Sequence, residues 1–545
     1  MANPAPGVSV NVSASSGNPR NNAPTGTWFV IGTAHGPSGV AVPVNSLNDF
    51  NTYFGSIVNG SLTGRYGGAT VSSTTLYDAL DVYFREGGVA AYVSRVNAST
   101  STAAVPAVYP YTTSYQTAVT TPSLTFAPLS AGTWAANAAS AAAPSGNAGV
   151  ALTLSWVSGS GSSLVYTAQI TLNGNVIATS PSLSLQTDLT GWLGSLPAYQ
   201  QLIKVSAVAS TTTNILPSST NLKMVVIFSG GTDVAVADAD ITAALTPFTD
   251  SYGQGQVSYP GCTTATCYAT LTQHAQTYNR VAFLDGADPA GVDNSATLVS
   301  AVATLQTATL NGSAVDPSYA AMFAPNLIVP GIVTTNASNT TGIVFNRSVP
   351  SSALAAARVA YMDTFNDCNV PAAGTGPGSS SYAIGLSFYY SGAQRATLNN
   401  GGVNTIRLVP TLNQIALYGF RSCAFDQNWV FLNNVRFRMQ AIRDFTLISE
   451  NFMFDEIDGR GQVFANLGGQ LAGQCQAYWL RKSIYGTNPG DSFTVNTGPQ
   501  VNNPATIAAG QINAQVNMRM APFGEFVTIN VTKYTTNAAL PNYNA

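Results

Sequence analysis

The chain has few charged side chains for its 545 residues. Asp, Glu, Lys and Arg make up 8% of it, against about 25% in ordinary globular proteins. The formal net charge is only −3, so bulk electrostatics predicts no affinity for nucleic acid or for an anionic membrane surface. Hydrophobic residues nevertheless reach 45%. That share excludes a disordered chain and suffices for several buried cores.

Long apolar runs and export signals are also missing. The sequence contains no uninterrupted apolar run long enough for a transmembrane helix, so we expect no direct membrane insertion. The start, MANPAPGVSVNV, lacks the basic residues and apolar run of a signal peptide. The five cysteines are odd in number, and only Cys262 and Cys267 are close in sequence. Without an export signal, free buried thiols are favoured over disulfides.

Residues suited to catalysis or metal binding are scarce. A catalytic triad or a histidine metal site would need His35 or His274, the two histidines of the chain. The spacing of Cys262 and Cys267 does not fit a zinc knuckle, and the acidic run at 455–458 does not fit a calcium loop. Residues 228–233, FSGGTD, follow an expected strand but match no nucleotide-binding loop. We therefore predict no catalytic residue, no cofactor and no metal.

The N-terminal hundred residues predict an arm followed by a βαβ unit. Val8, Val10 and Val12 alternate with polar residues, as in a strand. This strand belongs either to the edge of its own domain or to an arm that extends a sheet of a neighbouring subunit. Further on, the patterns predict strands at 27–32 and 89–96 and helices at 46–54 and 74–86.

The middle of the chain changes character twice. Residues 101–220 are rich in Ser, Thr, Ala and Gly and contain short alternating runs, which predicts an inserted β-rich domain. Residues 221–370 alternate expected strands and helices, the pattern of an α/β layer domain, with a strand at 223–228. Residues 371–405 are rich in Gly, Ser and Asn and predict a loop.

Residues 415–486 carry the clearest helical patterns. They predict a strand, a helix near 429–444, a linker and a second helix at 461–485 that ends at Gly486. Arg436 and Arg443 border the apolar stripe of the first helix. Arg481 and Lys482 fall in the last turn of the second, where the helix dipole favours cations.

The end of the chain predicts a β-hairpin and a polar tail. Residues 512–520 alternate strictly between apolar and polar side chains, and 522–524 supply a turn. In the expected second strand, 526–533, Val527, Ile529 and Val531 share a face. Residues 535–545 follow as a polar tail.

The order of these segments resembles the tail sheath proteins of contractile bacteriophages, in the sheath family of contractile injection systems. Each matching piece is short, but together they are collinear over residues 1–100 and 220–534. The pieces are PGV at 6–8, SLNDFNTYFG at 46–55, LYDALDVYFREGGVAAYVSRV at 76–96, SYAAMFAPNLIV at 318–329, VPSSALAAARVAYMD at 349–363, GGVNTIRL at 401–408, LYGFRS at 417–422, WVFLNNVRFRMQAI at 429–442, FMFDE at 452–456 and FVTINVTKY at 526–534.

The resemblance implies a structural subunit rather than an enzyme. Such subunits form a helical homo-oligomer of stacked rings around a tail tube protein, and they also meet baseplate and tail terminator proteins. Their terminal arms add strands to the sheets of neighbours, and contraction drives the tube through the host envelope for genome ejection. The resemblance places the protein in the virion, assembled in the host cytoplasm. It makes Val8, Val10, Val12, Val527, Ile529 and Val531 expected arm residues. Residues Arg436, Arg443, Arg481 and Lys482 either face the tube or pair within the subunit.

We thus expect a multidomain protein of mixed α/β and α+β class. Its predicted parts are an N-terminal arm (1–20), a discontinuous α/β domain (21–100 plus 221–404), a β-rich outer insertion (101–220), a tube-proximal polymerisation domain (405–534) and a C-terminal arm (535–545). The sheath of a phage-derived injection device remains an alternative. So does a non-enzymatic surface-layer or adhesin subunit, although that class needs an export signal. A hydrolase would need a nucleophile–base pair that the sequence does not show.

Overall fold

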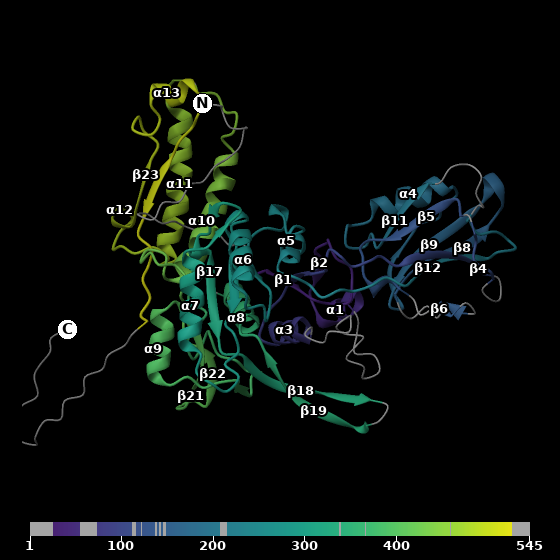
Figure 1. Ribbon diagram of the computed structural model, residues 1–545. Helices are drawn as coiled ribbons and strands as arrows, with labels where there is room; N and C mark the ends of the chain where they lie inside the picture. The colour runs from purple at the N-terminus through teal and green to yellow at the C-terminus, as the bar shows by residue number, and fades with distance from the viewer. Residues whose placement is uncertain are drawn as a thin grey trace, which may run out of the picture.

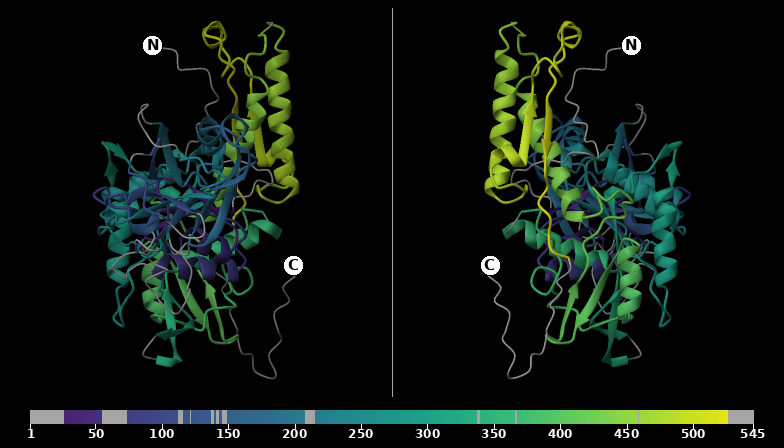
Figure 2. Two further views of the ribbon diagram at one scale, coloured as in Figure 1. Left: turned by 90° about the vertical axis from the view of Figure 1, so that its right-hand side faces the viewer. Right: turned by 90° about the vertical axis from the view of Figure 1, so that its left-hand side faces the viewer.

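A computed structural model of the protein has an α/β body from which two other parts project (Figure 1). A pair of long helices rises from one side of the body, and a β-rich domain extends from another side. Two side views show the helical pair rising from the body (Figure 2). The structure describes residues 26–54, 74–111, 116–120, 122–136, 139–140, 143–144, 149–207, 215–336, 339–365, 367–457 and 459–525.

The body is built on an eight-stranded sheet of order β2-β3-β1-β13-β14-β17-β21-β22. The six strands from β3 to β21 are parallel, and β2 and β22 are antiparallel edges. The strands of this sheet are β1 (Trp28–Gly32), β2 (Val42–Val44), β3 (Ala91–Arg95), β13 (Gln256–Ser258), β14 (Val281–Asp285), β17 (Ala320–Ala324), β21 (Val403–Val409) and β22 (Gln414–Leu417).

Helices cover both faces of this sheet, so its central strands are buried on both sides. In β1, Trp28 and Val30 join one hydrophobic core, which also holds residues of α3 and α8. Phe29 and Ile31 point the other way into a second core, with residues of α5, α6 and α7. The helices of the body are α1 (Leu47–Phe54), α3 (Thr74–Arg85), α5 (Ala239–Leu245), α6 (Ala265–Thr277), α7 (Ser295–Gln306), α8 (Ser352–Phe365) and α9 (Gly392–Asn400).

Most elements predicted for the body are confirmed within a few residues, but two features differ from the prediction. The expected loop at 371–405 contains α9 and the start of β21. A long hairpin of β18 (Leu327–Asn336) and β19 (Asn339–Val349) was not predicted, and it extends away from the body (Figure 1). Its base is fixed to α3, since Arg347 forms ion pairs of 2.6 Å with both Asp78 and Asp81. Short strands complete this part: β15 (Thr309–Leu310), β16 (Ser313–Ala314) and β20 (Gly385–Leu386).

The insertion is β-rich, as predicted, but it extends further along the chain. Strand β12, expected in the α/β sheet, instead pairs with β4 and β8 in a sheet of order β10-β9-β8-β12-β4. The insertion therefore ends after Ser229, not at residue 220. Its elements are β4 (Val105–Tyr111), β5 (Leu124–Pro128), β6 (Ala139–Ser140), β7 (Ala143–Pro144), β8 (Val150–Ser158), β9 (Val165–Leu172), β10 (Asn175–Thr179), α4 (Gln186–Ser195), β11 (Ile203–Ala207) and β12 (Lys223–Ser229).

The two chain segments that join the insertion to the body lie side by side. Thr102 on the way in and Thr232 on the way out exchange backbone hydrogen bonds of 3.2 and 3.1 Å. Their side-chain hydroxyls are also within 2.8 Å of each other. The insertion thus enters and leaves through one narrow antiparallel connection.

The C-terminal unit contains the two long helices and a two-stranded sheet. Its elements are α10 (Leu432–Glu450), α11 (Gln462–Leu480), α12 (Pro489–Ser492), β23 (Phe493–Asn496), α13 (Pro504–Ala508) and β24 (Gln515–Met518). Strand β24 pairs with the upstream strand β23, which was not predicted. The expected second strand, 526–533, lies outside the described residues, as do Val8, Val10 and Val12. Among described residues, no helix is both long and apolar enough to cross a membrane.

Candidate assembly interface

The long helices α10 and α11 pack around a core of their own. Phe437 from α10 and Leu467, Leu471 and Tyr478 from α11 belong to this core, together with residues of both strands. The hydroxyl of Tyr478 donates a 2.9 Å hydrogen bond to Asp444. The apolar stripe predicted for the second helix thus faces this core, whereas Leu432, Val435 and Met439 of the stripe predicted for the first helix pack into a core of the body. The unit has a hydrophobic centre separate from the body's two main cores.

Helix α11 ends earlier than predicted, at Leu480 rather than near Gly486. Lys482 takes the left-handed conformation with φ of 62°. Its N–H bonds to the carbonyl of Trp479 at 2.9 Å, and the N–H of Ser483 bonds to that of Tyr478 at 3.0 Å. This is the usual stop of a helix, with a lysine where glycine is preferred. The chain therefore reverses direction directly after the helix.

One of the glycines inside α11 allows close packing against the small sheet. A Cβ atom on Gly468 would lie 2.8 Å from the hydroxyl oxygen of Thr497, which follows β23. Gly469 and Gly473 meet no described neighbour within 4 Å. At Gly468, helix α11 thus packs closely against the residue that follows β23. Close packing against described residues does not explain Gly469 and Gly473.

The sheet of β23 and β24 is small and its outer edges are not filled by described strands. Four residue pairs join the two strands, from Phe493 with Met518 to Asn496 with Gln515. No third described strand belongs to this sheet. Unpaired strand edges present rows of N–H and C=O groups that readily accept a further strand. Within the described part of the chain, both outer edges of this sheet therefore lack a partner strand.

The C-terminal unit is locked to the body by buried polar contacts. Arg436 on α10 forms a 2.5 Å ion pair with Asp363 on α8. Arg436 is 1% exposed and also donates to the carbonyl of Cys368. The side-chain amide of Asn369 donates to the carbonyl of Ser483 at 3.1 Å. Buried contacts of this kind fix the orientation of the helical pair on the body.

After β24 the chain returns along the body to a second fixed point. The N–H of Ala521 bonds to the carbonyl of Ser483 at 3.1 Å. Four residues later, both carboxylate oxygens of Glu525 accept hydrogen bonds from Arg421, at 2.8 and 2.6 Å. Asn399 of α9 donates to the same carboxylate at 3.3 Å. This clamp fixes Glu525, the last described residue, on the body.

The four basic residues proposed from sequence occupy different environments. Arg436 lies inside the subunit and forms an internal ion pair, which was the alternative to contact with the tube. Arg443 is half-buried on α10 and forms no ion pair with another described residue. Arg481 and Lys482 are exposed at the end of α11. The structure thus brings Arg481 and Lys482 together at one helix end and separates Arg436 from them.

Sequence reasoning missed β23 and the clamp at Glu525. Local signals for the region around β23 exist, because Asn488 and Asn503 each cap a short helix that begins with proline. The residues of β23, FTVN, also alternate in polarity. No local signal identifies Glu525, since its partners lie more than a hundred positions upstream.

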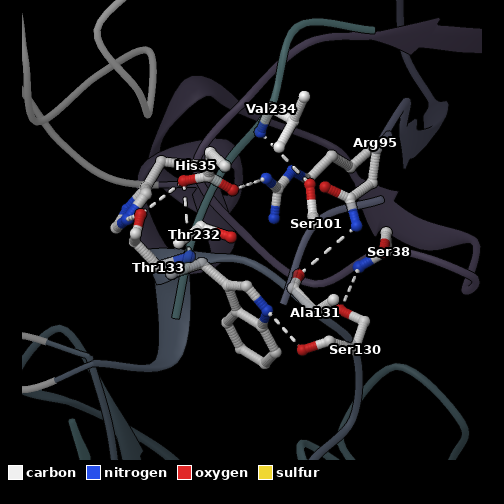
Figure 3. Close-up of polar contacts among 12 residues, drawn as sticks. His35, Ser38, Arg95, Ser101, Ser130, Ala131, Thr133, Thr232 and Val234 are labelled. Atoms are coloured by element: carbon white, nitrogen blue, oxygen red, sulfur yellow. Dashed lines mark hydrogen bonds and ion pairs between the residues drawn. The ribbon is translucent and has the colours of Figure 1, made fainter. Parts of the chain in front are cut away.

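The edge of the body sheet where α/β enzymes bind ligands is filled here by the insertion. The order of strands reverses around β1 and β13, and ligands of such sheets bind at the carboxyl ends of strands near that point. At this place Arg95, at the end of β3, forms a 2.5 Å ion pair with Asp233 (Figure 3). Thr133 of the insertion donates from its hydroxyl to the same carboxylate. The insertion and its exit segment thus dock on this edge.

His35 lies in this cluster but is not arranged as a catalytic base. Its Nε2 is 3.5 Å from the hydroxyl of Thr133, which already donates to Asp233 (Figure 3). Burial and the Arg95 charge lower the pKa of His35. Although burial opposes it, Arg95 and Thr133 hold the pKa of Asp233 below its usual range. The cluster therefore holds the insertion against the body through an ion pair and hydrogen bonds.

His274 is a structural residue on the other side of the sheet. Its Nε2 lies 2.9 Å from Nη1 of Arg280, so the neutral ring accepts that hydrogen bond. Burial, followed by the Arg280 charge, lowers the pKa of His274 to about 3. The guanidinium of Arg280 also donates to the carbonyls of Phe248, Thr249 and Gly253. Within the described residues, no group of three His, Cys, Asp or Glu could hold a metal ion.

Comparison with known proteins finds similarity in structure alone. No protein-family model matches the chain, and no curated protein matches it. A sheath tail protein from Listeria innocua has a TM-score of 0.51 at 11% identity, over 88% of this chain and 90% of that one. The helical sheath of the anti-feeding prophage in its contracted state has a TM-score of 0.49 at 13% identity, over 98% and 99%. The contracted PVC sheath of an extracellular contractile injection system has a TM-score of 0.48 at 12% identity, over 98% of both.

The similarity to the Listeria protein covers 88% of this chain and is a likeness of fold. The mixed α/β multidomain class expected from the sequence is confirmed. The resemblance to sheath proteins that the short collinear motifs indicated is likewise confirmed as a likeness of fold. The chain therefore has the fold of a sheath tail protein.

Proposed function

We propose that the protein is the structural subunit of a contractile tail sheath, which polymerises helically around a tail tube. The observation that carries this proposal is the two-stranded sheet β23–β24, whose edges lack a described partner strand. A sheet of two strands is marginal by itself. Strands added by neighbouring copies would complete it and link the subunits.

The added strands come, in this proposal, from the two ends of other copies. The N-terminal strand carries Val8, Val10 and Val12, and the C-terminal strand carries Val527, Ile529 and Val531. The clamp at Glu525 supports a C-terminal arm, because it fixes the root of the segment that must reach a neighbour. Contacts that do not close on themselves produce a helical polymer.

Strand addition suits a sheath that contracts. Backbone pairing joins two subunits at a small sheet, while the bodies are free to change their mutual orientation. A gain of a few kcal/mol per subunit is then summed over the whole polymer. In this reading contraction drives the tube through the host envelope, for genome ejection by a phage or for delivery by a phage-derived device, and baseplate and tail terminator proteins bind the two sheath ends.

The C-terminal unit is the part we place next to the tube. It projects from a different side of the body than the insertion does (Figure 1), which fits an inner and an outer side of a cylinder. Arg443, Arg481 and Lys482 are the candidate contacts, and Arg436 is excluded from direct contact by its burial in the subunit.

Reversing the exposed charge at the end of α11 should impair tube attachment. The double change Arg481→Glu and Lys482→Glu is expected to lower the fraction of tubes covered by sheath at least several-fold when sheath and cognate tube protein are co-expressed. Lys204→Glu, at an exposed site of the insertion, is the matched control. Equal coverage by both variants would argue against tube contact at this helix end.

Electron microscopy of the purified full-length protein tests the function itself. Negative staining is expected to show long hollow cylinders, or discrete particles that assemble into cylinders when the tube protein is added. Monomers that never assemble under either condition would overturn the proposal.

A further inference from the structure

Cys262 and Cys267 lie on either side of the start of helix α6. Cys262 ends a tight turn in which its N–H bonds to the carbonyl of Tyr259 at 3.0 Å. Gly261, with φ of 80°, provides the left-handed position of this turn. The N–H of Gly261 donates to Asp285 at 3.1 Å and fixes the turn to the end of β14. The position of Cys262 is therefore determined by the fold.

The side chain of Cys262 is directed at the first turn of α6. Its Sγ lies 3.9 Å from the hydroxyl of Thr264, the residue that caps the helix. The same hydroxyl accepts the N–H of Cys267 at 3.1 Å. Each of the two thiols shifts the pKa of the other. Both cysteines thus contact the hydroxyl of Thr264 at the start of α6.

The two cysteines differ in access and acidity. Cys262 is half-buried, whereas Cys267 and the other three cysteines are buried. Contact with the Cys267 thiol and hydrogen bonds from Thr264 lower the pKa of Cys262, while burial and the nearby Asp238 oppose this. Contact with Cys262 and burial raise the pKa of Cys267. Redox-sensitive sites have this asymmetry of an accessible acidic thiol beside a resolving thiol.

We propose that Cys262 and Cys267 are a peroxide-oxidised thiol pair that closes to a disulfide. The Cys262 thiolate attacks one oxygen of hydrogen peroxide, the O–O bond breaks, and the released hydroxide takes a proton to give water. Cys262 is then a sulfenic acid. The sulfur of Cys267 attacks the Cys262 sulfur, the S–O bond breaks, and a second water leaves with the Cys267 proton. Two thiols and one peroxide yield one disulfide and two waters.

The disulfide would join the turn after β13 to the first helical turn of α6. This links two segments that border the second core of the body, which contains Cys267. A thiol reductant reverses the bond by exchange. The pair therefore gives the body a reversible covalent link.

Peptide mapping of the full-length protein tests the pair. Trypsin releases both cysteines in one peptide, 224–280, because no Lys or Arg lies between Lys223 and Arg280. After limiting hydrogen peroxide, this peptide is expected to lose two hydrogens and to resist iodoacetamide, and dithiothreitol is expected to restore both properties. Cys368, Cys423 and Cys475 should stay reactive after unfolding. Oxidation of Cys262 no faster than of these three would overturn the proposal.

Two single variants separate the steps. Cys267→Ser is expected to leave the Cys262 sulfenic acid unresolved, so that dimedone labelling of Cys262 rises several-fold over the unaltered protein. Cys262→Ser is expected to abolish both dimedone labelling and the mass loss. Cys423→Ser, at a buried cysteine, is the control and should leave the disulfide unchanged. Direct conversion of Cys262 to sulfinic acid with Cys267 still free would contradict the resolving role.

Discussion

Deletion of residues 1–15 is expected to give a folded monomer that does not polymerise. The deleted segment contains Val8, Val10 and Val12, the proposed added strand, and none of the described residues of the body. A strand of this length contributes about five backbone hydrogen bonds at about 1 kcal/mol each. Loss of about 5 kcal/mol per contact weakens association by about three to four orders of magnitude.

Sedimentation and negative-stain microscopy measure this loss, and circular dichroism checks that the fold is retained. A sharper pair of variants tests backbone pairing itself. Val10→Pro removes one N–H donor and should weaken assembly, whereas Val10→Thr keeps the donor and a β-branched side chain and should assemble normally. Sheaths of normal length from the truncated protein would show that residues 1–15 do not join the subunits.

Replacing Asp363 by alanine is expected to loosen the C-terminal unit from the body. The change leaves the buried guanidinium of Arg436 without its carboxylate, and breaking a buried ion pair in this way costs about 3–5 kcal/mol. Hydrogen exchange of the α10 and α11 amides, followed by mass spectrometry, should show markedly faster exchange than in the unaltered protein.

The matched control replaces both partners. Arg436→Met with Asp363→Leu removes both charges, and apolar replacement of a buried pair is often close to neutral. The double variant should therefore recover most of the protection that Asp363→Ala loses. Unchanged exchange in Asp363→Ala would mean that the ion pair does not hold the two units together.

Local sequence patterns were enough to predict the helices of the C-terminal unit. They were not enough to predict which strands pair with each other. The stripe of Leu467, Leu471, Cys475 and Tyr478 repeats at the helical period, and this period needs no knowledge of the partner. Strand β12 has a continuous apolar sequence that fits either sheet. Its place beside β4 and β8 depends on contacts with residues about seventy to a hundred and twenty positions away.

The interface residues illustrate the same limit. Arg436 borders an apolar stripe, a position equally compatible with solvent and with a buried partner on another helix. Asp363 lies 73 positions upstream. Nothing in the sequence around it indicates that its partner is Arg436. The strict alternation at 512–520 correctly indicated a strand at β24, but no local signal indicated that β24 pairs with β23. Strand β23 lies upstream, before the helix α13.

The narrow connection at Thr102 and Thr232 makes the inserted domain a unit that can be exchanged for another. Because its two ends are adjacent and hydrogen-bonded to each other, a different domain with neighbouring termini could replace it without altering the course of the body's chain. In an assembled cylinder each such replacement would be repeated once per subunit. The connection therefore marks a grafting position for displaying foreign domains in a dense, regular array.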